Sequence, residues 1–393
     1  MNAIQQMREP FVQVKLGDVC SFKQGYQFGL DEQLLHPKEG YARFLRIENY
    51  TQNSTDFRYV KVDDPDKIID EKDVVIVRYG ASAGYVGRGF SGVLANNMFR
   101  VIPGENVDRE FLYYLLTDRR VFDYFQKSMI GGAMPALSFQ IVGNLKVQLP
   151  PLPEQKKIAS ILATWDEAIA YKEKLIERKI ERKQGLMQKL LSGQVRFPGF
   201  YGEWKSVPIE KICTLSIGKT PSRNRKEYWG TGYKWIAIAD MKEKYISQTE
   251  EEITEQAVKE TGIKRIPKNT VIMSFKLTLG RLAITAEDMY SNEAIVSFFN
   301  NNPDELDNEY LYYYLSHIDI TKYGSRAAKG ITLNRDSLKE IIVKLPELDE
   351  QIKIREVLTL ADKEIDLLKQ ELALLKQQKQ GLMQQLLSGK VRV

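Results

Sequence analysis

An internal repeat constrains the fold of this chain more than any other feature of its sequence. Residues 149–155 (Leu-Pro-Pro-Leu-Pro-Glu-Gln) return as residues 345–351 (Leu-Pro-Glu-Leu-Asp-Glu-Gln), 196 positions further along the chain. The same offset carries residues 183–193 onto residues 379–389 without a gap. A block of about forty residues is therefore present twice at constant length, and each copy follows a longer, more variable unit.

The variable units in front of the two blocks are related more weakly and have a mixed composition. Residues 74–77 and 270–273 are rich in β-branched side chains, which is typical of buried strands. Residues 108–116 and 307–315 have the pattern of short amphipathic helices. Each unit is therefore predicted to be a mixed α/β domain.

The repeated blocks have the pattern of long helices that pair along a seam. Residues 154–192 and 350–388 contain no proline, and both stretches end on Ser-Gly, a helix stop signal. Counting from Ile158 and from Ile354 in alternating steps of four and three residues gives ten positions in each block. Seven of these positions are apolar in the first block and nine in the second. Ordinary core helices average only about 11–12 residues, so a coiled coil is favoured. The predicted seam consists of Ile158, Leu162, Trp165, Ile169, Ile176, Leu186, Leu190, Ile354, Leu358, Ile365, Leu368, Leu372, Leu375, Leu382 and Leu386.

Composition sets the broad class of protein. The chain has 393 residues, of which 43% are apolar and 28% charged, as expected for a folded protein of two or three domains. Its net charge of +5 is compatible with nucleic-acid binding but does not argue for it. No apolar run is long enough to span a membrane and the first residues lack a signal core, so a cytoplasmic location is expected.

A search for catalytic motifs finds none. The sequence has no GxxxxGK[ST] phosphate loop and no glycine fingerprint for a dinucleotide or methyl-donor cofactor. His36 and His317 are isolated, so no metal site is predicted. Cys20 and Cys213 lie on apolar segments and are expected to be buried, because a reactive thiol needs a partly exposed, electropositive site. We therefore expect neither catalytic nor metal-binding residues in this chain.

Two features keep other interpretations open. Asp66, Asp70 and Glu71 lie near Lys72 and could in principle hold Mg²⁺, but the second unit has no counterpart, so a solvated acidic loop is favoured. The tyrosine clusters at residues 113–114 and 312–314 could stack on bases, although the leucines around them favour the core.

Polar and basic loops are better candidates for contacts with nucleic acid. Residues 218–226 hold four cationic side chains beside small hydroxyls, a composition suited to phosphates and grooves. Residues 22–27 are the less basic counterpart in the first unit. The predicted DNA-binding residues are Lys23, Gln24, Tyr26, Arg78, Tyr79, Arg88, Lys219, Thr220, Ser222, Arg223, Arg225, Lys276, Arg281, Arg326 and Lys329.

The chain resembles the specificity subunit of type I restriction–modification systems. The resemblance lies in two variable units, each followed by a block that begins Leu-Pro…Glu-Gln and ends Gln-Gly-Leu-Met-Gln…Leu-Leu-Ser-Gly. The resemblance implies an α+β fold with a pseudo-two-fold internal repeat. Two mixed α/β target recognition domains would be separated by two long antiparallel coiled-coil helices. The implied domains are residues 1–152 and 197–348, and the implied spacer helices are residues 153–196 and 349–393.

The resemblance also implies a function, that of a non-catalytic DNA reader. Each recognition domain would read one half of an asymmetric, bipartite target in double-stranded DNA. The helices would dock methyltransferase subunits, and restriction subunits would join through them. S-adenosylmethionine, ATP and Mg are expected on those partners, with no cofactor in this chain and no membrane contact. The aligned loops that differ between the units are Arg78-Tyr79 against Ser274-Phe275 and Gly25-Tyr26 against Gly218-Lys219.

Two rival classes of protein make different predictions. An enzyme acting alone, such as a nuclease or a modification enzyme, would need a complete catalytic constellation, and metal-dependent cleavage by the purified chain would reveal it. A structural coiled-coil scaffold would leave two units of about 150 residues unexplained. Sequence-independent DNA binding by the assembled complex would favour that scaffold.

Overall fold

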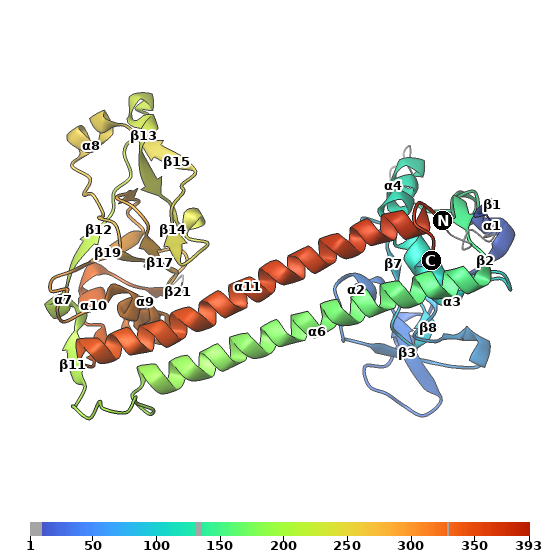
Figure 1. Cartoon of the computed structure of the whole chain (residues 1–393), viewed down its shortest axis with the longest axis horizontal. Helices are drawn as coiled ribbons and strands as arrows, with labels where there is room; N and C mark the ends of the chain where they lie inside the picture. The colour runs from blue at the N-terminus through green and yellow to red at the C-terminus, as the bar shows by residue number, and fades with distance from the viewer. Residues whose placement is uncertain (1–9, 130–135, 328–329) are drawn as a thin grey trace, which may run out of the picture. The chain divides into compact units, whose positions relative to one another are not determined.

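The computed structural model describes residues 10–129, 136–327 and 330–393 of the chain (Figure 1). The chain forms two compact units. The first comprises Met1–Glu173 and Gln370–Val393, and the second comprises Lys174–Lys369. Each unit contains a mixed α/β domain together with part of each of two 40-residue helices, α6 (Leu152–Leu191) and α11 (Leu348–Leu387). The strands and helices of the two domains correspond closely.

The domain of the first unit is built on two four-stranded sheets and one two-stranded sheet. One sheet has the order β2 (Cys20–Gln24), β9 (Met98–Pro103), β6 (Val74–Val77) and β7 (Val86–Gly87), with antiparallel neighbours throughout. The other has the order β4 (Arg58–Lys61), β3 (Tyr41–Leu45), β8 (Gly92–Leu94) and β5 (Ile68–Ile69). The two-stranded sheet pairs β1 (Val12–Lys15) with β10 (Lys146–Leu149).

The domain of the second unit repeats this plan with a five-stranded central sheet. Its order is β12 (Cys213–Ile217), β19 (Ile295–Asn300), β16 (Val271–Ser274), β17 (Leu282–Thr285) and β14 (Tyr245–Ile246). A three-stranded sheet has the order β15 (Glu251–Ile253), β13 (Trp229–Ile236) and β18 (Tyr290–Ser291). The remaining pairs are β11 (Lys205–Pro208) with β22 (Ile342–Leu345) and β20 (Ser325–Ala327) with β21 (Gly330–Thr332).

Short helices complete each domain. Those of the first unit are α1 (Leu16–Val19), α2 (Ile47–Thr51), α3 (Arg109–Leu116), α4 (Arg119–Ser128) and α5 (Phe139–Gly143). Those of the second are α7 (Ile209–Ile212), α8 (Glu255–Thr261), α9 (Asn308–His317) and α10 (Arg335–Lys339). Asp108 and Asp307 cap α3 and α9 by accepting backbone N–H groups, which explains why the two predicted helices begin at these aspartates. The 3-10 turns are η1 (Leu30–Glu32), η2 (Pro65–Lys67), η3 (Lys226–Tyr228), η4 (Ile238–Asp240) and η5 (Ile320–Tyr323).

Strand β6 is buried on both faces, which explains its continuous run of apolar residues. Val74 and Ile76 belong to a core shared with α3 and both long helices, whereas Val75 and Val77 face a second core under β3 and β8. Strand β16 is divided in the same way between two cores of the second unit. The central sheet of each domain is therefore packed from both sides.

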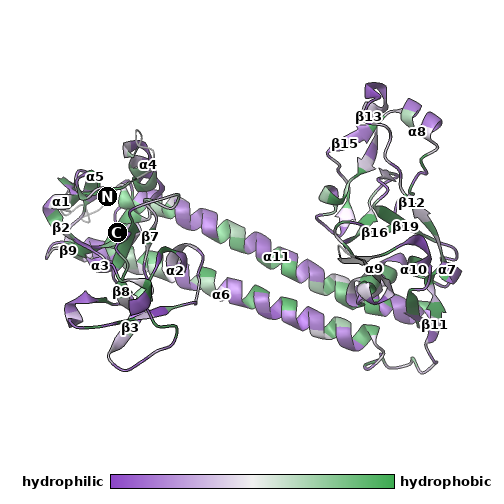
Figure 2. Ribbon diagram, turned by 180° about the vertical axis from the view of Figure 1, so that it is seen from behind, coloured by the Kyte–Doolittle hydropathy of each residue, from purple (hydrophilic) through white to green (hydrophobic). Residues whose placement is uncertain are grey.

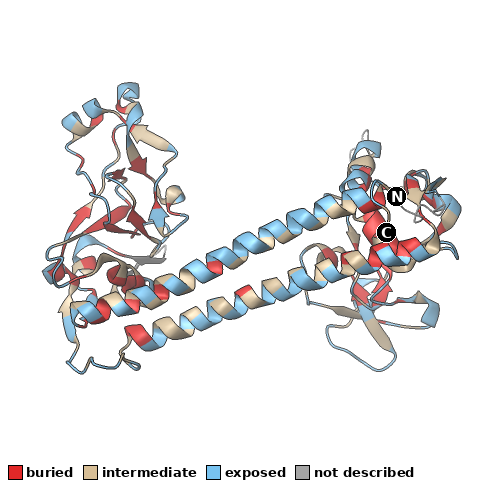
Figure 3. Ribbon diagram, viewed as in Figure 1, coloured by how far each residue is buried: buried red, intermediate tan, exposed pale blue. Residues whose placement is uncertain are grey.

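The two long helices run antiparallel to one another within each unit. None of the fifteen predicted seam residues is exposed, and buried and exposed positions alternate along both helices (Figure 3). Hydrophilic and hydrophobic residues alternate in the same way (Figure 2). The apolar side chains therefore pack against the opposite helix or the domain core.

Lysines occupy the gaps in the apolar seam, and each is paired with a carboxylate of the opposite helix. In the first unit, the amino group of Lys172 lies 2.7 Å from Glu371, and Lys379 pairs with Asp166. In the second unit, the corresponding pairs are Lys179 with Glu364 and Lys183 with Asp362. As the residue number rises on α6 it falls on α11, so these ion pairs favour the antiparallel register.

The repeated Glu-Gln dipeptide attaches each domain to its helix. The buried side-chain oxygen of Gln155 accepts the backbone N–H of Asp108 at 2.7 Å, and its amide donates to the carbonyls of Asn106 at 2.9 Å and Pro150 at 2.8 Å. Every hydrogen bond is made to the backbone, so a glutamine is required here for its combination of acceptor and donors.

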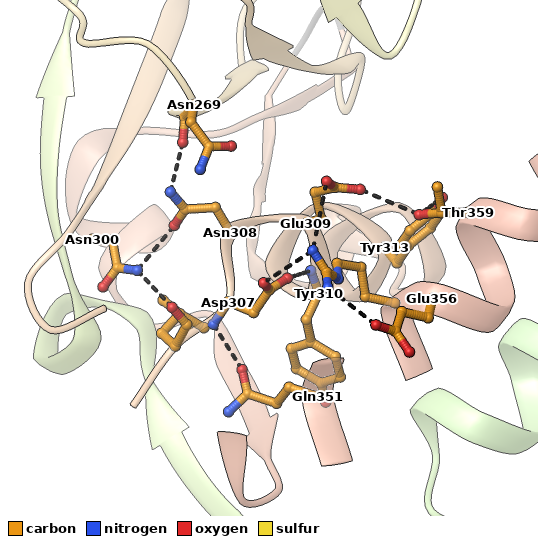
Figure 4. Close-up of polar contacts among 12 residues, drawn as sticks. Asn269, Asn300, Asp307, Asn308, Glu309, Tyr310, Tyr313, Gln351, Glu356 and Thr359 are labelled. Atoms are coloured by element: carbon orange, nitrogen blue, oxygen red, sulfur yellow. Dashed lines mark hydrogen bonds and ion pairs between the residues drawn. The ribbon is translucent and has the colours of Figure 1, made fainter. Parts of the chain in front are cut away.

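Gln351 makes the same three contacts in the second unit. Its oxygen accepts the N–H of Asp307 at 2.9 Å (Figure 4), and its amide donates to the carbonyls of Glu305 at 2.8 Å and Pro346 at 2.9 Å. Glu309 in the first turn of α9 accepts a hydrogen bond from Thr359 on α11 at 3.2 Å. The start of α9 is therefore fixed to the start of α11 by polar contacts.

The acidic segment of the first unit differs in part from the solvated loop that was expected. Asp66, Asp70 and Glu71 are exposed, but Asp73 is buried at 2% exposure. Its carboxylate lies 2.7 Å from the guanidinium of Arg109 and 2.9 Å from that of Arg100. The last carboxylate of the segment is thus part of the fold, because two arginines neutralise its buried charge.

Candidate nucleic-acid interface

Three loops of the first unit meet at one end of the central sheet. The chain that leaves β2 is bonded to the β8–β9 turn, since the N–H of Tyr26 donates to the carbonyl of Leu94 at 2.7 Å. The β6–β7 loop joins them, since the N–H of Arg78 donates to the carbonyl of Asn97 at 2.8 Å. These bonds hold side chains from three separate stretches of sequence at the same edge.

The second unit builds the same edge with the same hydrogen bonds. The N–H of Lys219 donates to the carbonyl of Ser291 at 2.8 Å, and the N–H of Phe275 donates to the carbonyl of Ala294 at 2.9 Å. Tyr26 and Lys219 are therefore equivalent positions. The alignment of Gly25-Tyr26 with Gly218-Lys219 agrees with this backbone pattern.

A glycine is required where the first loop crosses the turn. A Cβ atom added to Gly25 would lie 2.1 Å from the carbonyl oxygen of Ala95, and one added to Gly218 would lie 2.2 Å from that of Asn292. Both distances are far below van der Waals contact, so any side chain would push the loops apart. Gly25 and Gly218 therefore owe their identity to close backbone approach.

The alignment of the second loop needs a correction. The backbone bonds place Arg78 opposite Phe275 and Tyr79 opposite Lys276, one residue away from the alignment based on sequence. Ser274 is instead the last residue of β16 and pairs with β19. The reason is that the offset between the two units is already 197 in these strands, where Val74–Val77 of β6 correspond to Val271–Ser274 of β16, whereas the long-helix blocks repeat at 196.

In the first unit, this edge displays side chains of the types that read base edges. Arg78 donates through Nη1 to the amide oxygen of Gln24, whose nitrogen donates to the carbonyl of Asn96. The Arg78 guanidinium also lies 4.9 Å from the ring centre of Tyr79 and 5.4 Å from that of Phe139. An arginine can donate two hydrogen bonds to guanine, and a glutamine or asparagine can form two with adenine. The cluster of Gln24, Arg78, Tyr79 and Asn96 therefore has the chemistry to recognise bases directly.

The other predicted residues of the first unit lie in two places. The amino group of Lys23 donates to the carbonyl of Asp66 at 3.0 Å, next to the cluster on β2. Arg88 has different neighbours, because its guanidinium stacks 3.8 Å from the ring centre of Tyr113 and pairs with Glu110 on α3. The structure therefore does not bring Arg88 together with Gln24 and the other loop residues.

In the second unit, the equivalent side chains have a different character. The position of Gln24 is occupied by Ile217, that of Arg78 by Phe275 and that of Asn96 by Glu293. The carboxylate of Glu293 thus replaces the amide of Asn96 at this edge, and it accepts a hydrogen bond from Thr220. The amino group of Lys219 donates to the carbonyl of Thr261 at 2.6 Å.

The two arginines of the basic loop of the second unit are paired with carboxylates of their own domain. Arg223 stacks 3.7 Å from the ring centre of Trp229 and forms a two-pronged ion pair with Glu251, with 2.8 Å between Nη2 and Oε2. Hydrogen bonding to Arg223 lowers the pKa of Glu251. Arg225 lies 2.7 Å from both Glu227 and Glu260. The charges of these two arginines are therefore available to a phosphate only in competition with the carboxylates.

The remaining predicted residues differ in their surroundings. Lys276 is exposed in the β16–β17 loop, and Arg281 donates to the carbonyl of Ile238 at 3.0 Å. The carbonyl of Ser222 accepts the indole N–H of Trp229 at 3.2 Å. The backbone of Arg326 pairs with Ile331 in the β20–β21 hairpin. Lys329 lies outside the described residues.

The tyrosine clusters and the cysteines, which were not predicted to contact DNA, have structural roles. The hydroxyl of Tyr114 donates to Asp166 at 2.8 Å and that of Tyr313 donates to Asp362 at 2.6 Å, so these tyrosines join each domain to a long helix. Burial raises the pKa of Cys20 to about 11.

Among the described residues, no three histidine, cysteine or acidic side chains are grouped to hold a metal ion. No helix in the same part of the chain is long and apolar enough to cross a membrane.

Sequence reasoning missed three residues of this candidate interface: Asn96, Leu277 and Glu293. None of them has a charge pattern or motif that stands out in the sequence. Only their position could have identified them, because each lies in a loop at the sheet edge. That position becomes clear only when the register of the strands is known. The repeat alone was misleading at this point, since the offset of 196 that holds in the long helices is 197 at β6 and β16 and at the turns beside them.

Comparisons with known proteins identify the family. A family model described as "Type I restriction modification DNA specificity domain" matches residues 8–182 and 201–377. The chain belongs to this family, and it is a DNA-recognition subunit without a catalytic role. The MjaVIII specificity subunit of Methanocaldococcus jannaschii is 26% identical over 413 aligned residues, covering 97% of this chain and 92% of that protein. The MjaIX specificity subunit of the same organism is 34% identical over 167 residues, 41% of this chain and 38% of that protein.

Solved structures share the fold along the whole chain. One chain comes from a study described as "Structural basis underlying complex assembly and conformational transition of the type I R-M system". It has a TM-score of 0.64 at 18% identity and covers 96% of this chain and 97% of its own length. The HsdS subunit from Thermoanaerobacter tengcongensis has a TM-score of 0.52 at 18% identity and covers 99% of both chains. The two mixed α/β domains and long helices are therefore the architecture of this family.

Proposed function

We propose that this chain reads an asymmetric, bipartite target in double-stranded DNA, with one half-site read by the loop edge of each unit. The observation that supports this is the equivalence of the two edges. Their backbones are bonded alike, yet Arg78 and Asn96 of the first edge correspond to the buried Phe275 and to Glu293 in the second, so the two edges display different polar side chains. Identical frames with different side chains suit two unlike base sequences, because phosphate contacts position a protein whereas side chains at base edges specify the sequence.

The catalytic work belongs to partners under this proposal. Methyltransferase subunits dock on the long helices, and restriction subunits join through them. S-adenosylmethionine, ATP and Mg are bound by those partners, and the complex acts in the cytoplasm. Exposed leucines on the part of α11 in the second unit support a docked helix: Leu360 and Leu367 are seven residues apart and are 69% and 60% exposed.

An exchange of domains tests the bipartite target. Residues 10–150 are replaced by the matching unit of a relative, and methylated adenines are mapped by sequencing DNA exposed to the assembled complex. One half-site should change while the other is retained. A target in which both halves change together would contradict independent reading by the two units.

Docking is tested separately with Leu360→Asp combined with Leu367→Asp. The charged pair should reduce co-purification of the methyltransferase subunit while thermal unfolding of the chain is unchanged. Lys363→Ala on the same helix is the matched control, because Lys363 is exposed and its replacement leaves both leucines intact. Undiminished co-purification of the double variant would place docking elsewhere.

A further inference from the structure

The β16–β17 loop has a leucine where the equivalent loop has a glycine. Leu277 and Gly80 are each the third residue after the end of their strand, β16 and β6. Both adopt a positive φ, 65° for Leu277 and 85° for Gly80. Glycine adopts this conformation freely, whereas a leucine there is strained by contact of its Cβ with the backbone. The backbone therefore does not account for leucine at this position.

The fold does not account for it either. The side chain of Leu277 is 94% exposed, whereas Phe275 in the same loop is 2% exposed. Leu279 packs against the core that contains Phe275. A single exposed leucine is common on protein surfaces, but one that is held in a strained conformation needs a separate reason.

The tip that presents Leu277 is held in place by a buried hydroxyl. The Oγ of Ser274, which is fully buried, accepts the N–H of Arg281 at 3.0 Å and donates to the carbonyl of Thr278. The N–H of Gly280 donates to the carbonyl of Ser274 at 2.8 Å. These hydrogen bonds hold the backbone before and after Leu277 in a fixed conformation. The exposed side chain of Leu277 is therefore held in place by the loop itself.

The loop belongs to the edge that is proposed to face DNA. Phe275 bonds it to the β18–β19 turn, and the exposed Lys276 directly precedes Leu277. Among the groups that bases display in the major groove, the apolar one is the C5-methyl of thymine. An exposed leucine beside a lysine therefore fits a thymine whose neighbouring phosphate contacts the amino group.

We propose that Leu277 contacts the C5-methyl group of a thymine in the half-site read by the second unit. This inference rests on the proposed function and assigns one element of its specificity. Gly80 offers no side chain at the equivalent position, so this contact belongs to the second unit. Burial of one methyl group corresponds to about a fourfold gain in affinity for thymine over uracil.

The test uses the complex of this chain with its methyltransferase subunits and a duplex that carries its mapped target. Each thymine in both half-sites is replaced in turn by uracil, which lacks only the C5-methyl group, and affinity is measured by competition. For the wild-type complex, one replacement should weaken binding about fourfold. With Leu277→Gly, that replacement should have no effect. This variant is suited to the positive φ, so a lost preference does not arise from misfolding.

Two further variants act as controls. Leu277→Met keeps an apolar side chain and should retain most of the preference for thymine, whereas Lys276→Ala should weaken thymine and uracil duplexes alike. The inference is overturned if the wild-type complex prefers its target but tolerates uracil everywhere, or if Leu277→Gly keeps the full penalty. A wild-type complex without any sequence preference would instead overturn the proposed function, and this inference with it.

Discussion

Arg392 forms a two-pronged ion pair with the buried carboxylate of Glu154, with 2.8 Å between Nε and Oε1 and 2.6 Å between Nη2 and Oε2. Arg196 holds the carboxylate of Glu350 in the same way, at 2.9 and 2.7 Å. In both pairs the glutamate lies in the first turn of one long helix, and the arginine follows the end of the other. Each pair therefore joins the two helices within one unit.

Removing the charge of Glu350 should destabilise the second unit. Glu350→Gln keeps the shape of the side chain but leaves Arg196 without its carboxylate. We expect the midpoint of thermal unfolding to fall by several degrees. The indole N–H of Trp204 donates to Glu350 at 3.0 Å, so tryptophan fluorescence should also shift. Glu203→Gln, at an exposed neighbouring position, serves as the control, and an unchanged midpoint and spectrum would contradict the prediction.

The glutamine of the repeated dipeptide should not tolerate a glutamate. In Gln155→Glu, an ionised carboxylate cannot donate to the carbonyls of Asn106 and Pro150, so two buried acceptors lose their partner. We expect a loss of at least about 2 kcal/mol in the free energy of unfolding at neutral pH.

This loss should depend on pH. Burial beside carbonyl groups raises the pKa of the introduced carboxyl group, so its neutral form is favoured in the folded state. Stability should be higher below that pKa and fall as the pH rises through it. Urea unfolding at pH 5 and pH 8 measures the difference, with Gln184→Glu at an exposed helix position as the control. Equal losses for both variants would be evidence against the role given to Gln155.

The two cysteines should resist alkylation in the folded protein. Burial raises the pKa of Cys20 from 9.0 to about 11 and that of Cys213 from 9.0 to about 12. The thiols are protonated in both states well below pH 9, so their contribution to stability is complete there. It is lost as the pH rises through about 11 for Cys20 and about 12 for Cys213. Labelling with iodoacetamide at pH 8, followed by mass spectrometry, should modify unfolded chains only. Rapid labelling of both thiols in native buffer would show that the cores around them open readily.

The pairing of Arg223 with Glu251 should limit DNA binding by the basic loop. Glu251→Gln removes the competing carboxylate, so affinity should rise for all sequences and the dependence of the affinity on salt should become steeper. Arg223→Ala should weaken binding instead. If the guanidinium contacts a phosphate, the salt dependence falls by about one counterion, whereas a base contact costs about 1–3 kcal/mol at one position of the site.

Binding curves at several salt concentrations distinguish these cases. Arg223→Lys is the informative control, because it keeps the charge but loses the planar stacking on Trp229. If Glu251→Gln and Arg223→Ala both leave the affinity unchanged, this loop does not face the nucleic acid.

The long helices and several strands could be predicted because their causes are local. A proline-free stretch with seam periodicity predicts α6, and the run of β-branched residues at Val74–Val77 coincides with β6. The lysines of the seam were harder to interpret, because a charge there is explained only by its partner. Lys379, for example, finds Asp166 on the other helix, more than two hundred residues away in sequence.

The interface was predictable only in outline. Gln24 and Arg78 could be named as candidates from residue type, but their contact joins the end of β2 to the loop after β6, and the sequence does not reveal the order of these strands. Arg88 was also a candidate from its residue type, but the structure does not place it beside Gln24 and Arg78. Its cationic character suggested DNA, yet Tyr113 and Glu110 bind that charge within the domain. Residue type predicts what a side chain can do, whereas its neighbours decide which of these roles it fulfils.

The way the chain shares its helices determines the order in which its parts can mature during synthesis. The core of the first unit includes Leu386 and Leu387 of α11, whereas the second unit is formed by the continuous stretch Lys174–Lys369. A ribosome therefore releases all of the second unit before it releases the residues that complete the first. The part translated first must wait for contacts across more than two hundred residues of sequence, and until Leu387 has emerged it exposes apolar surface that a chaperone would recognise.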